Sequence, residues 1–155
     1  MNFYYHYFVF NQAIRTMHFM PGYADYLPIP SDYEKFQDSL VEKCDLMISL
    51  TKQLSESKNS FLDKMRANFG VKKVSVKLDN FIILSFDDLL NEIKRLTKKK
   101  LSIREQDEWE GYFKKSKTEL LHLKRQIDNT ELDLNQLVYE LYRLNQNEIL
   151  LVQSA

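Results

Sequence analysis

Residues 103–143 read IREQDEWEGYFKKSKTELLHLKRQIDNTELDLNQLVYELYR, and their apolar pattern governs the predicted architecture. Large apolar side chains recur there every seven residues, which places one stripe of a helix against a partner helix. The spacing predicts one helix over about 103–143, opened by a capping box at Ser102–Glu105. The first row is Phe113, Leu120, Ile127, Leu134 and Leu141, and the interleaved row is Trp109, Ser116, Leu123, Thr130 and Leu137.

The same repeat occurs earlier in the chain and predicts a second long helix over about 32–67. Ser31 and Glu34 have the spacing of a capping box, and Gly70 follows the last apolar positions, where glycine best tolerates the left-handed backbone that ends many helices. Two heptad helices of similar length most simply form an antiparallel hairpin. The seam between them is predicted to hold Leu40, Met47, Leu54, Phe61, Trp109, Phe113, Leu120, Ile127, Leu134 and Leu141.

The segment between these helices, about residues 69–101, is predicted to be a small mixed insert. Residues 71–84 place valines among lysines and then run into an apolar stretch, which is typical of a short β-strand. Ser85 opens a capping sequence for a helix over about 86–98, and lysines follow at its negative end. A last short helical turn is predicted over Ile149–Val152. The predicted fold class is therefore mainly α: a long antiparallel, coiled-coil-like hairpin with a small mixed insert.

The first 30 residues differ in character from the rest. Six of the first ten are aromatic, and Pro28 and Pro30 then forbid helix because each ring fixes φ and removes an amide donor. We expect the stretch from Pro21 to Ser31 to be an extended crossover that ends one unit and begins another, and residues 31–155 to form the hairpin with its insert. The aromatic segment before the crossover is expected to lie against something larger, as in the middle of an element. The alternative for Phe3–Phe10 is an aromatic helix folded onto this chain's own core.

Charge is distributed unevenly, although the 22 basic and 22 acidic side chains cancel. Residues 58–104 hold 12 basic and 5 acidic groups, a net of +7, between two acidic stretches. This segment is either a footprint for an anionic partner such as DNA or a solvated connector neutralised by its flanks. DNA-backbone contacts are predicted for Arg15, Lys72, Lys73 and Lys77. Lys94, Arg95, Lys98, Lys99, Lys100 and Arg104 are further phosphate candidates, and Tyr23 and Tyr26 are candidates for stacking on bases or ribose.

No catalytic constellation is recognisable in the sequence. His6, His18 and His122 lack ligand partners at metal-site spacing, and no glycine-rich loop can cradle a phosphate or a nucleotide cofactor. The single Cys44 excludes a disulfide framework and is predicted to be a small buried hydrophobe. No apolar run is long enough to span a membrane. These observations favour binding over catalysis on this chain, with no metal and no catalytic residue.

Five segments resemble, in order, the C-terminal end of type IIG restriction–modification enzymes and related adenine-specific DNA methyltransferases. The resemblance covers nearly the whole chain, and its most specific part is the run ending in LVYELYRL. Arg143 departs from the family pattern, which commonly has Gly at that place. The segments are Tyr23–Pro30 (YADYLPIP), Phe81–Leu96 (FIILSFDDLLNEIKRL), Gln106–Phe113 (QDEWEGYF), Gln126–Asp128 (QID) and Leu137–Leu144 (LVYELYRL).

The resemblance implies a TaqI-like C-terminal specificity domain, in which residues 1–30 are the end of a truncated target-recognition domain and the hairpin is a spacer. Its implied partners are double-stranded DNA and the methyltransferase or nuclease portion of the same enzyme. The S-adenosylmethionine site, any Mg²⁺ site and the Asn-Pro-Pro-Tyr-type catalytic motif would lie in that portion. No such tetrapeptide occurs in this chain, which therefore looks like the tail of a larger enzyme. A cytoplasmic location in a prokaryotic cell and a role in defence against foreign DNA follow from the same resemblance.

Two other interpretations stay open. The chain is alternatively a non-enzymatic coiled-coil interaction protein, which self-associates or pairs with a partner helix through its aromatic segment and seam. A third interpretation is half of a type I-like specificity subunit, which would work with separate methylation and translocation subunits.

Overall fold

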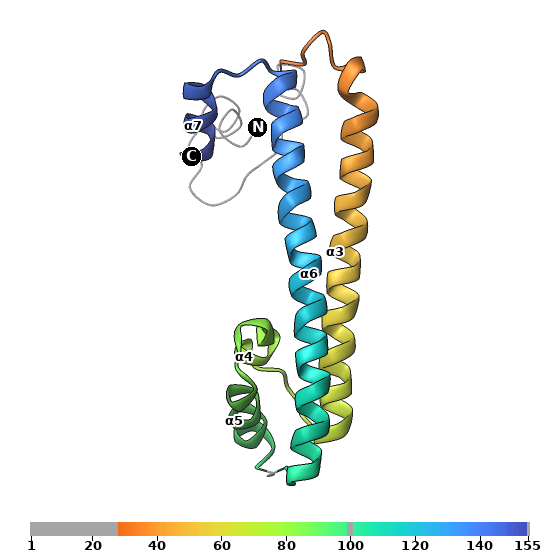
Figure 1. The fold of residues 1–155 in the computed structure, drawn as a ribbon, viewed down its shortest axis with the longest axis vertical. Coiled ribbons are helices and arrows are strands. Elements are labelled where there is room, and N and C mark those ends of the chain that lie inside the picture. Colours follow the sequence, from red (N-terminus) through yellow and green to blue (C-terminus); the bar gives the residue numbers. More distant parts are fainter. Residues whose placement is uncertain (1–27, 99–100, 155) are drawn as a thin grey trace. The chain divides into compact units, whose positions relative to one another are not determined.

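The fold is that of a computed structural model, which describes residues 28–98 and 101–154 (Figure 1). Within these residues all regular structure is helical, and there is no strand. The elements are α3 (Glu34–Phe69), α4 (Val76–Asp79), the 3-10 helix η2 (Phe81–Ile83), α5 (Phe86–Thr97), α6 (Ile103–Leu141) and α7 (Gln146–Ser154).

The two long helices, α3 and α6, pack against each other as an antiparallel hairpin (Figure 1). The mainly α hairpin predicted from the two heptad patterns is thereby confirmed, and the helix ends differ from the predicted ones by about two residues. All ten residues predicted for the seam are buried or half-buried. A polar bond also joins the helices, because the Ser57 hydroxyl donates to Glu119 Oε1 at 2.8 Å.

The predicted β-stretch in residues 71–84 is wrong, because this part of the insert is helical. The Ser75 hydroxyl accepts a hydrogen bond from the Leu78 amide at 3.3 Å and so caps α4. Leu78 and Phe81, three residues apart, are both fully buried, and this spacing matches a helical turn rather than the alternation of a strand. Three β-branched valines among lysines, at positions 71, 74 and 76, misled the prediction, because tertiary packing overrode their strand propensity.

Capping explains where the helices begin. Ser85 and Asp88 form the predicted capping box of α5, and Ser102 and Glu105 exchange the corresponding bonds at the start of α6. The capping box predicted at Ser31 is wrong. Its hydroxyl instead donates to the Asp32 carboxylate at 3.3 Å, and backbone carbonyls of the preceding turn accept the first amides of α3.

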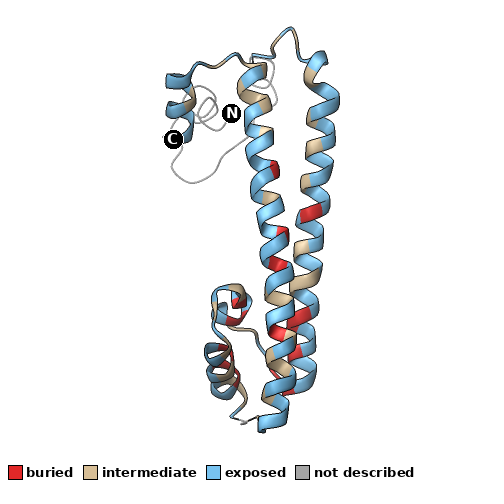
Figure 2. Cartoon of the chain, in the orientation of Figure 1, coloured by how far each residue is buried: buried red, intermediate tan, exposed pale blue. Residues whose placement is uncertain are grey.

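The chain divides into two compact units, of which Lys43–Leu132 contains the insert and the core. Figure 2 shows many of the buried residues of this unit where α4 and α5 lie beside the long helices, and others further along the hairpin. The Phe61 ring stacks on Phe81 at 4.0 Å and lies 6.2 Å from Phe113, so α3, η2 and α6 meet around it. Fully buried aromatic rings in contact bury large apolar areas, and this cluster therefore fixes the insert on the hairpin. The other buried members of the cluster are Leu62, Met65, Phe69, Val71, Leu78, Leu89, Ile93 and Leu120.

The second unit comprises residues 1–42 and 133–155, of which the structure describes residues 28–42 and 133–154. Pro28–Pro30 have no regular secondary structure, and the rest of the predicted crossover and the aromatic segment Phe3–Phe10 lie outside the described residues. In this unit the Tyr142 hydroxyl donates to the Pro28 carbonyl at 3.1 Å. The Arg143 guanidinium pairs with the Asp32 carboxylate at 2.5 Å, so the end of α6 is tied to the segment that leads into α3.

Candidate nucleic-acid interface

The predicted backbone-contact lysines are exposed on one short segment. Lys72 and Lys73 lie in the bend between α3 and α4, and Lys77 lies on α4. Arg15 lies outside the described residues, as do the stacking candidates Tyr23 and Tyr26.

The local backbone explains why these lysines face solvent. Gly70, with φ +69°, ends α3 in the left-handed conformation that glycine tolerates at little cost. Val71 then turns into the core, where it is buried, and the capping Ser75 restarts the helix. The two lysines between these anchors cannot reach the core and project outward, which makes them available to an anion.

The other basic candidates differ in whether they form ion pairs. Arg95 and Arg104 are engaged by the carboxylates of Glu92 and Glu108, respectively. Lys94 and Lys98 are exposed and form no ion pair with a described residue. Lys99 and Lys100 lie outside the described residues.

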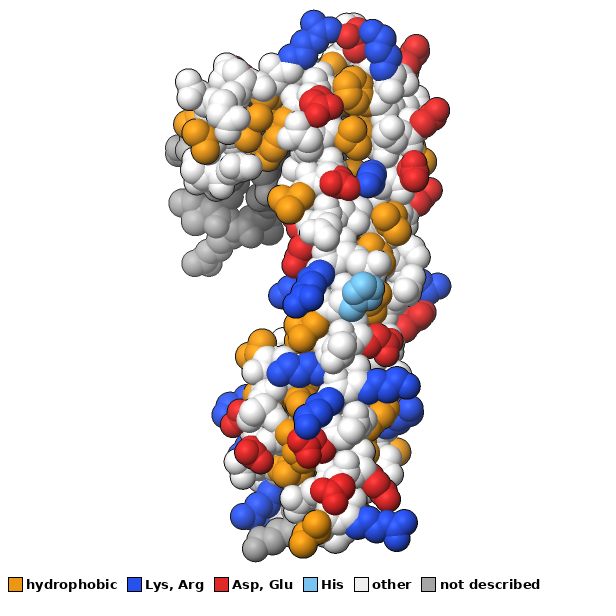
Figure 3. All heavy atoms as spheres, viewed as in Figure 1, with side chains coloured by type: hydrophobic (Ala, Val, Ile, Leu, Met, Phe, Trp, Pro, Cys, Tyr) orange, Lys and Arg blue, Asp and Glu red, His pale blue; other side chains and the backbone are white. Residues whose placement is uncertain are grey.

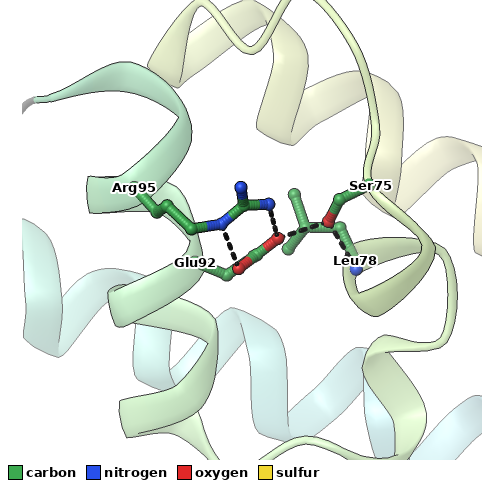
Figure 4. Close-up of polar contacts among 4 residues, drawn as sticks. All are labelled: Ser75, Leu78, Glu92 and Arg95. Carbon is green, nitrogen blue, oxygen red and sulfur yellow. Dashed lines mark hydrogen bonds and ion pairs between the residues drawn. The ribbon is translucent and has the colours of Figure 1, made fainter.

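A buried carboxylate joins α4 to α5, and the sequence did not point to it (Figure 4). Glu92 accepts hydrogen bonds from Arg95 Nε at 2.9 Å and Arg95 Nη2 at 2.6 Å. The Ser75 hydroxyl donates to the same carboxylate at 2.5 Å while accepting from the Leu78 amide. Only 5% of the Glu92 surface is exposed, so its charge persists there because these donors satisfy both oxygens.

This network sets the protonation state of the carboxylate. The hydrogen bonds from Arg95, and then the one from Ser75, lower the pKa of Glu92 to about 2. Lys77 also favours the charged form by its proximity. Glu92 is therefore ionised at neutral pH and neutralises Arg95, which leaves the exposed lysines as the free positive charge of the insert.

The visible surface is mixed rather than uniformly basic (Figure 3). Over α4, α5 and the adjoining part of α6, Lys and Arg side chains are interspersed with Asp and Glu. Several of these acids are locally paired, such as Asp79 with Lys58 at 2.8 Å. An anion is therefore expected to bind at the unpaired lysines rather than over the whole face.

The described part of the chain holds no group of three or more His, Cys, Asp or Glu residues that could bind a metal ion. Cys44 is exposed, so the prediction of a buried thiol is wrong. No helix among the described residues is long and apolar enough to cross a membrane.

The fold and its surface define an all-helical hairpin with an inserted helical subdomain that exposes lysines. The chain belongs to a family described as a domain of unknown function, DUF8810, whose model matches residues 33–138. The match spans α3, the whole insert and nearly all of α6. Comparisons with the curated proteins and with the solved structures find no match for this chain.

Two sets of polar contacts could not be predicted from the sequence. Glu92 and Arg95, three residues apart on a helix, would have indicated an exposed pair, but not that the carboxylate is buried and also accepts a hydrogen bond from Ser75. The contacts of Tyr142 and Arg143 with the Pro28–Asp32 segment join positions more than a hundred residues apart, and no local pattern reveals them.

Proposed function

We propose that this chain is the C-terminal specificity and spacer part of a site-specific adenine DNA methyltransferase or type IIG restriction–modification enzyme. Its hairpin holds and orients DNA for methylation or cleavage performed by another part of the enzyme, in the cytoplasm of a prokaryotic cell. S-adenosylmethionine and any Mg²⁺ would bind in that other part.

One observation supports this proposal above the others. Leu137–Leu144, the most specific of the resembling segments, contacts Pro28, the first described residue of the resembling proline segment, through the hydrogen bond from Tyr142 to Pro28. Arg143, which stands where the family commonly has Gly, has φ 52° in the left-handed region. Glycine is the residue that this region favours, so the local backbone agrees with the family pattern although the side chain does not.

In this proposal the chain acts by holding the DNA duplex in place relative to the catalytic part of the enzyme. A hairpin of two long helices is stiff, because each helix satisfies its own backbone and the two share a packed seam. Exposed lysines on the insert give affinity for phosphates without sequence information. Together they fix where the duplex lies relative to the catalytic part.

The test is binding of the purified chain to a random duplex across a salt series. We expect a Kd in the micromolar range at low salt and a steep fall in affinity as salt rises. The double variant Lys72→Ala/Lys73→Ala should weaken binding and reduce the salt slope by about 1.8, since each phosphate contact contributes roughly 0.9.

The matched control is Lys35→Ala/Lys52→Ala. It removes the same number of charges from α3, where each lysine is already paired with a nearby carboxylate. We expect this control to bind like the wild type. Absence of binding by the wild type at low salt would contradict DNA contact by this chain, and equal effects of the two variants would contradict a localised site.

A second function, self-association through a helix face, has one observation in its favour. Ile48 on α3 is 67% exposed and lines a shallow, mostly apolar groove with Met47 and Thr51. Sedimentation of the wild type and of Ile48→Ser tests it. A wild-type dimer that the substitution converts to a monomer would favour the interaction protein over the enzyme part.

A further inference from the structure

The insert presents an exposed row of side chains, which we call the α4–η2 ridge and define as Val76, Asn80 and Ile83. The Asn80 amide donates to the Val76 carbonyl at 3.2 Å, and the Ile83 amide donates to the Asn80 carbonyl at 3.2 Å. The three residues therefore stand on consecutive turns, at spacings of four and three that bring side chains to one face. Leu78 and Phe81 occupy the opposite face and are fully buried.

The ridge is unusual because its ends are apolar and almost wholly exposed. Val76 is 81% exposed and Ile83 is 82% exposed, higher than any other described large apolar residue. Between them the Asn80 side chain makes no hydrogen bond with any described residue. The ridge therefore offers a partner two exposed apolar side chains with a free amide between them.

Positive charge borders the ridge. Lys72 and Lys73 precede Val76 in the chain, and Lys77 follows it, and all three are exposed. Asp79, which directly precedes Asn80 in the chain, is neutralised by Lys58 at 2.8 Å, and Asp88 lies near Lys77. The partner that complements this surface therefore carries apolar groups that face the ridge and negative charges that face the lysines beside it.

Duplex DNA offers that combination in its major groove. A thymine presents a methyl group there, an adenine presents the N7 acceptor and N6 donor that an asparagine amide pairs with, and phosphates border both. An acidic peptide would match the lysines and the apolar residues, but it would give the free amide no defined partner.

We propose that the α4–η2 ridge contacts base edges of A·T pairs in the major groove, while Lys72, Lys73 and Lys77 bind the adjoining phosphates. Val76 and Ile83 meet thymine methyl groups, and Asn80 pairs with adenine. This inference rests on the proposed function and deepens it, because it assigns base contact to the insert itself.

The experiment compares the affinity of the chain for two duplexes that differ only in the methyl groups of their thymines. One is a duplex of about 20 base pairs rich in A·T pairs, and the other has deoxyuridine in place of every thymidine, which removes the methyl group and leaves all phosphates and pairing. We expect the wild type to bind the thymidine duplex about fourfold more tightly for each methyl contact, from roughly 0.8 kcal/mol per buried carbon.

The variant Val76→Ser/Ile83→Ser should bind both duplexes equally, with an unchanged salt slope. The control Val41→Ser/Ile103→Ser removes exposed β-branched side chains from α3 and α6, away from the ridge, and should keep the wild-type discrimination. Asn80→Ala should reduce binding to both A·T duplexes but not to a G·C-only duplex. Each result is the ratio of two Kd values measured on the same protein. A variant that is less stable would bind both duplexes less well and would leave this ratio unchanged.

Three outcomes would overturn the inference. Equal binding of the wild type to the two A·T duplexes, with normal salt dependence, would remove the ridge from base contact and leave the proposed function standing. Binding to polyglutamate as tight as to DNA, and weakened by Val76→Ser/Ile83→Ser, would assign the ridge to an acidic peptide. Absence of all duplex binding would overturn DNA contact by this chain together with the inference.

Discussion

The Arg143 guanidinium donates a hydrogen bond to the Asp32 carboxylate at 2.5 Å, although the two residues are 111 positions apart. This bond is the main cause that lowers the pKa of Asp32, with further contributions from the nearby charges of Lys35 and of Arg143 itself. Arg143 adopts a left-handed backbone at the end of α6, where its amide bonds to the Glu140 carbonyl and the Leu144 amide to the Tyr139 carbonyl. This is a Schellman ending, in which glycine is usual.

The first prediction compares two residues in the same strained conformation. Lys98 at the end of α5 has φ 57°, close to the value at Arg143, and makes no ion pair with a described residue. Lys98→Gly should stabilise the chain by about 0.5–1 kcal/mol, because relief of the left-handed strain exceeds the added freedom of the unfolded chain. Urea unfolding at neutral pH measures this gain.

Arg143→Gly gains the same backbone relief and loses the pair with Asp32. It should therefore stabilise the chain less than Lys98→Gly does, because an exposed ion pair contributes a small favourable term that the substitution removes. A larger gain from Arg143→Gly than from Lys98→Gly would show that the pair with Asp32 is destabilising.

The second prediction concerns pH and the Glu92 network. The pKa of Glu92 is lowered to about 2 in the folded chain, below its usual value near 4.5. A lowered pKa adds stability that is fully present above the unfolded value and is lost as pH falls through the folded value. We expect the free energy of unfolding to fall between about pH 5 and pH 2 as this carboxylate becomes protonated.

Glu92→Gln is the matched variant, because it keeps the size and removes the charge that Arg95 and Ser75 bind. It should cost about 1–3 kcal/mol at neutral pH, the usual loss of a charged hydrogen bond in a buried setting. Its unfolding free energy should also vary less with pH than that of the wild type. A parallel pH dependence of the two proteins would assign the acid sensitivity to other carboxylates.

The long helices were predictable from sequence because a heptad repeat is a local pattern that survives without knowledge of the partner. Leu120 and Phe113 lie in the predicted row and are buried. The capping boxes at Ser85 and Ser102 were equally local, since two residues three positions apart define each. The same spacing at Ser31 gave a wrong prediction, because the Ser31 hydroxyl bonds to Asp32 instead of capping α3.

The insert was harder to predict because its conformation depends on distant contacts. Val76 is exposed and Leu78 is buried, but a run of valines among lysines matches a strand as well as it matches a short helix. The helical conformation is stabilised by a distant contact, because Phe61 of α3 stacks on Phe81 of η2. The exposed ridge also escaped prediction, because only the fold shows that Val76 and Ile83 have no apolar neighbour to cover them.

The third prediction tests the aromatic centre of the core. Phe61 and Phe81 are fully buried and in stacked contact, so Phe61→Ala should destabilise the chain by about 3–5 kcal/mol, the usual cost of removing a buried phenylalanine. Val76→Ala is the control, because Val76 is exposed and its loss should change stability by less than about 0.5 kcal/mol. Thermal unfolding followed by circular dichroism distinguishes the two, and similar melting temperatures would place the core elsewhere.

The fourth prediction separates a working cap from one that only the sequence suggests. The Ser85 hydroxyl accepts the Asp88 amide at 3.1 Å and caps α5, whereas the Ser31 hydroxyl donates to Asp32 and caps no helix. Ser85→Ala should therefore cost about 1 kcal/mol, the typical value of a lost N-cap, and Ser31→Ala should cost almost nothing. Because both serines are exposed, neither substitution leaves a cavity. An equal loss at both positions, measured by urea unfolding, would mean that Ser31 caps α3 in solution after all.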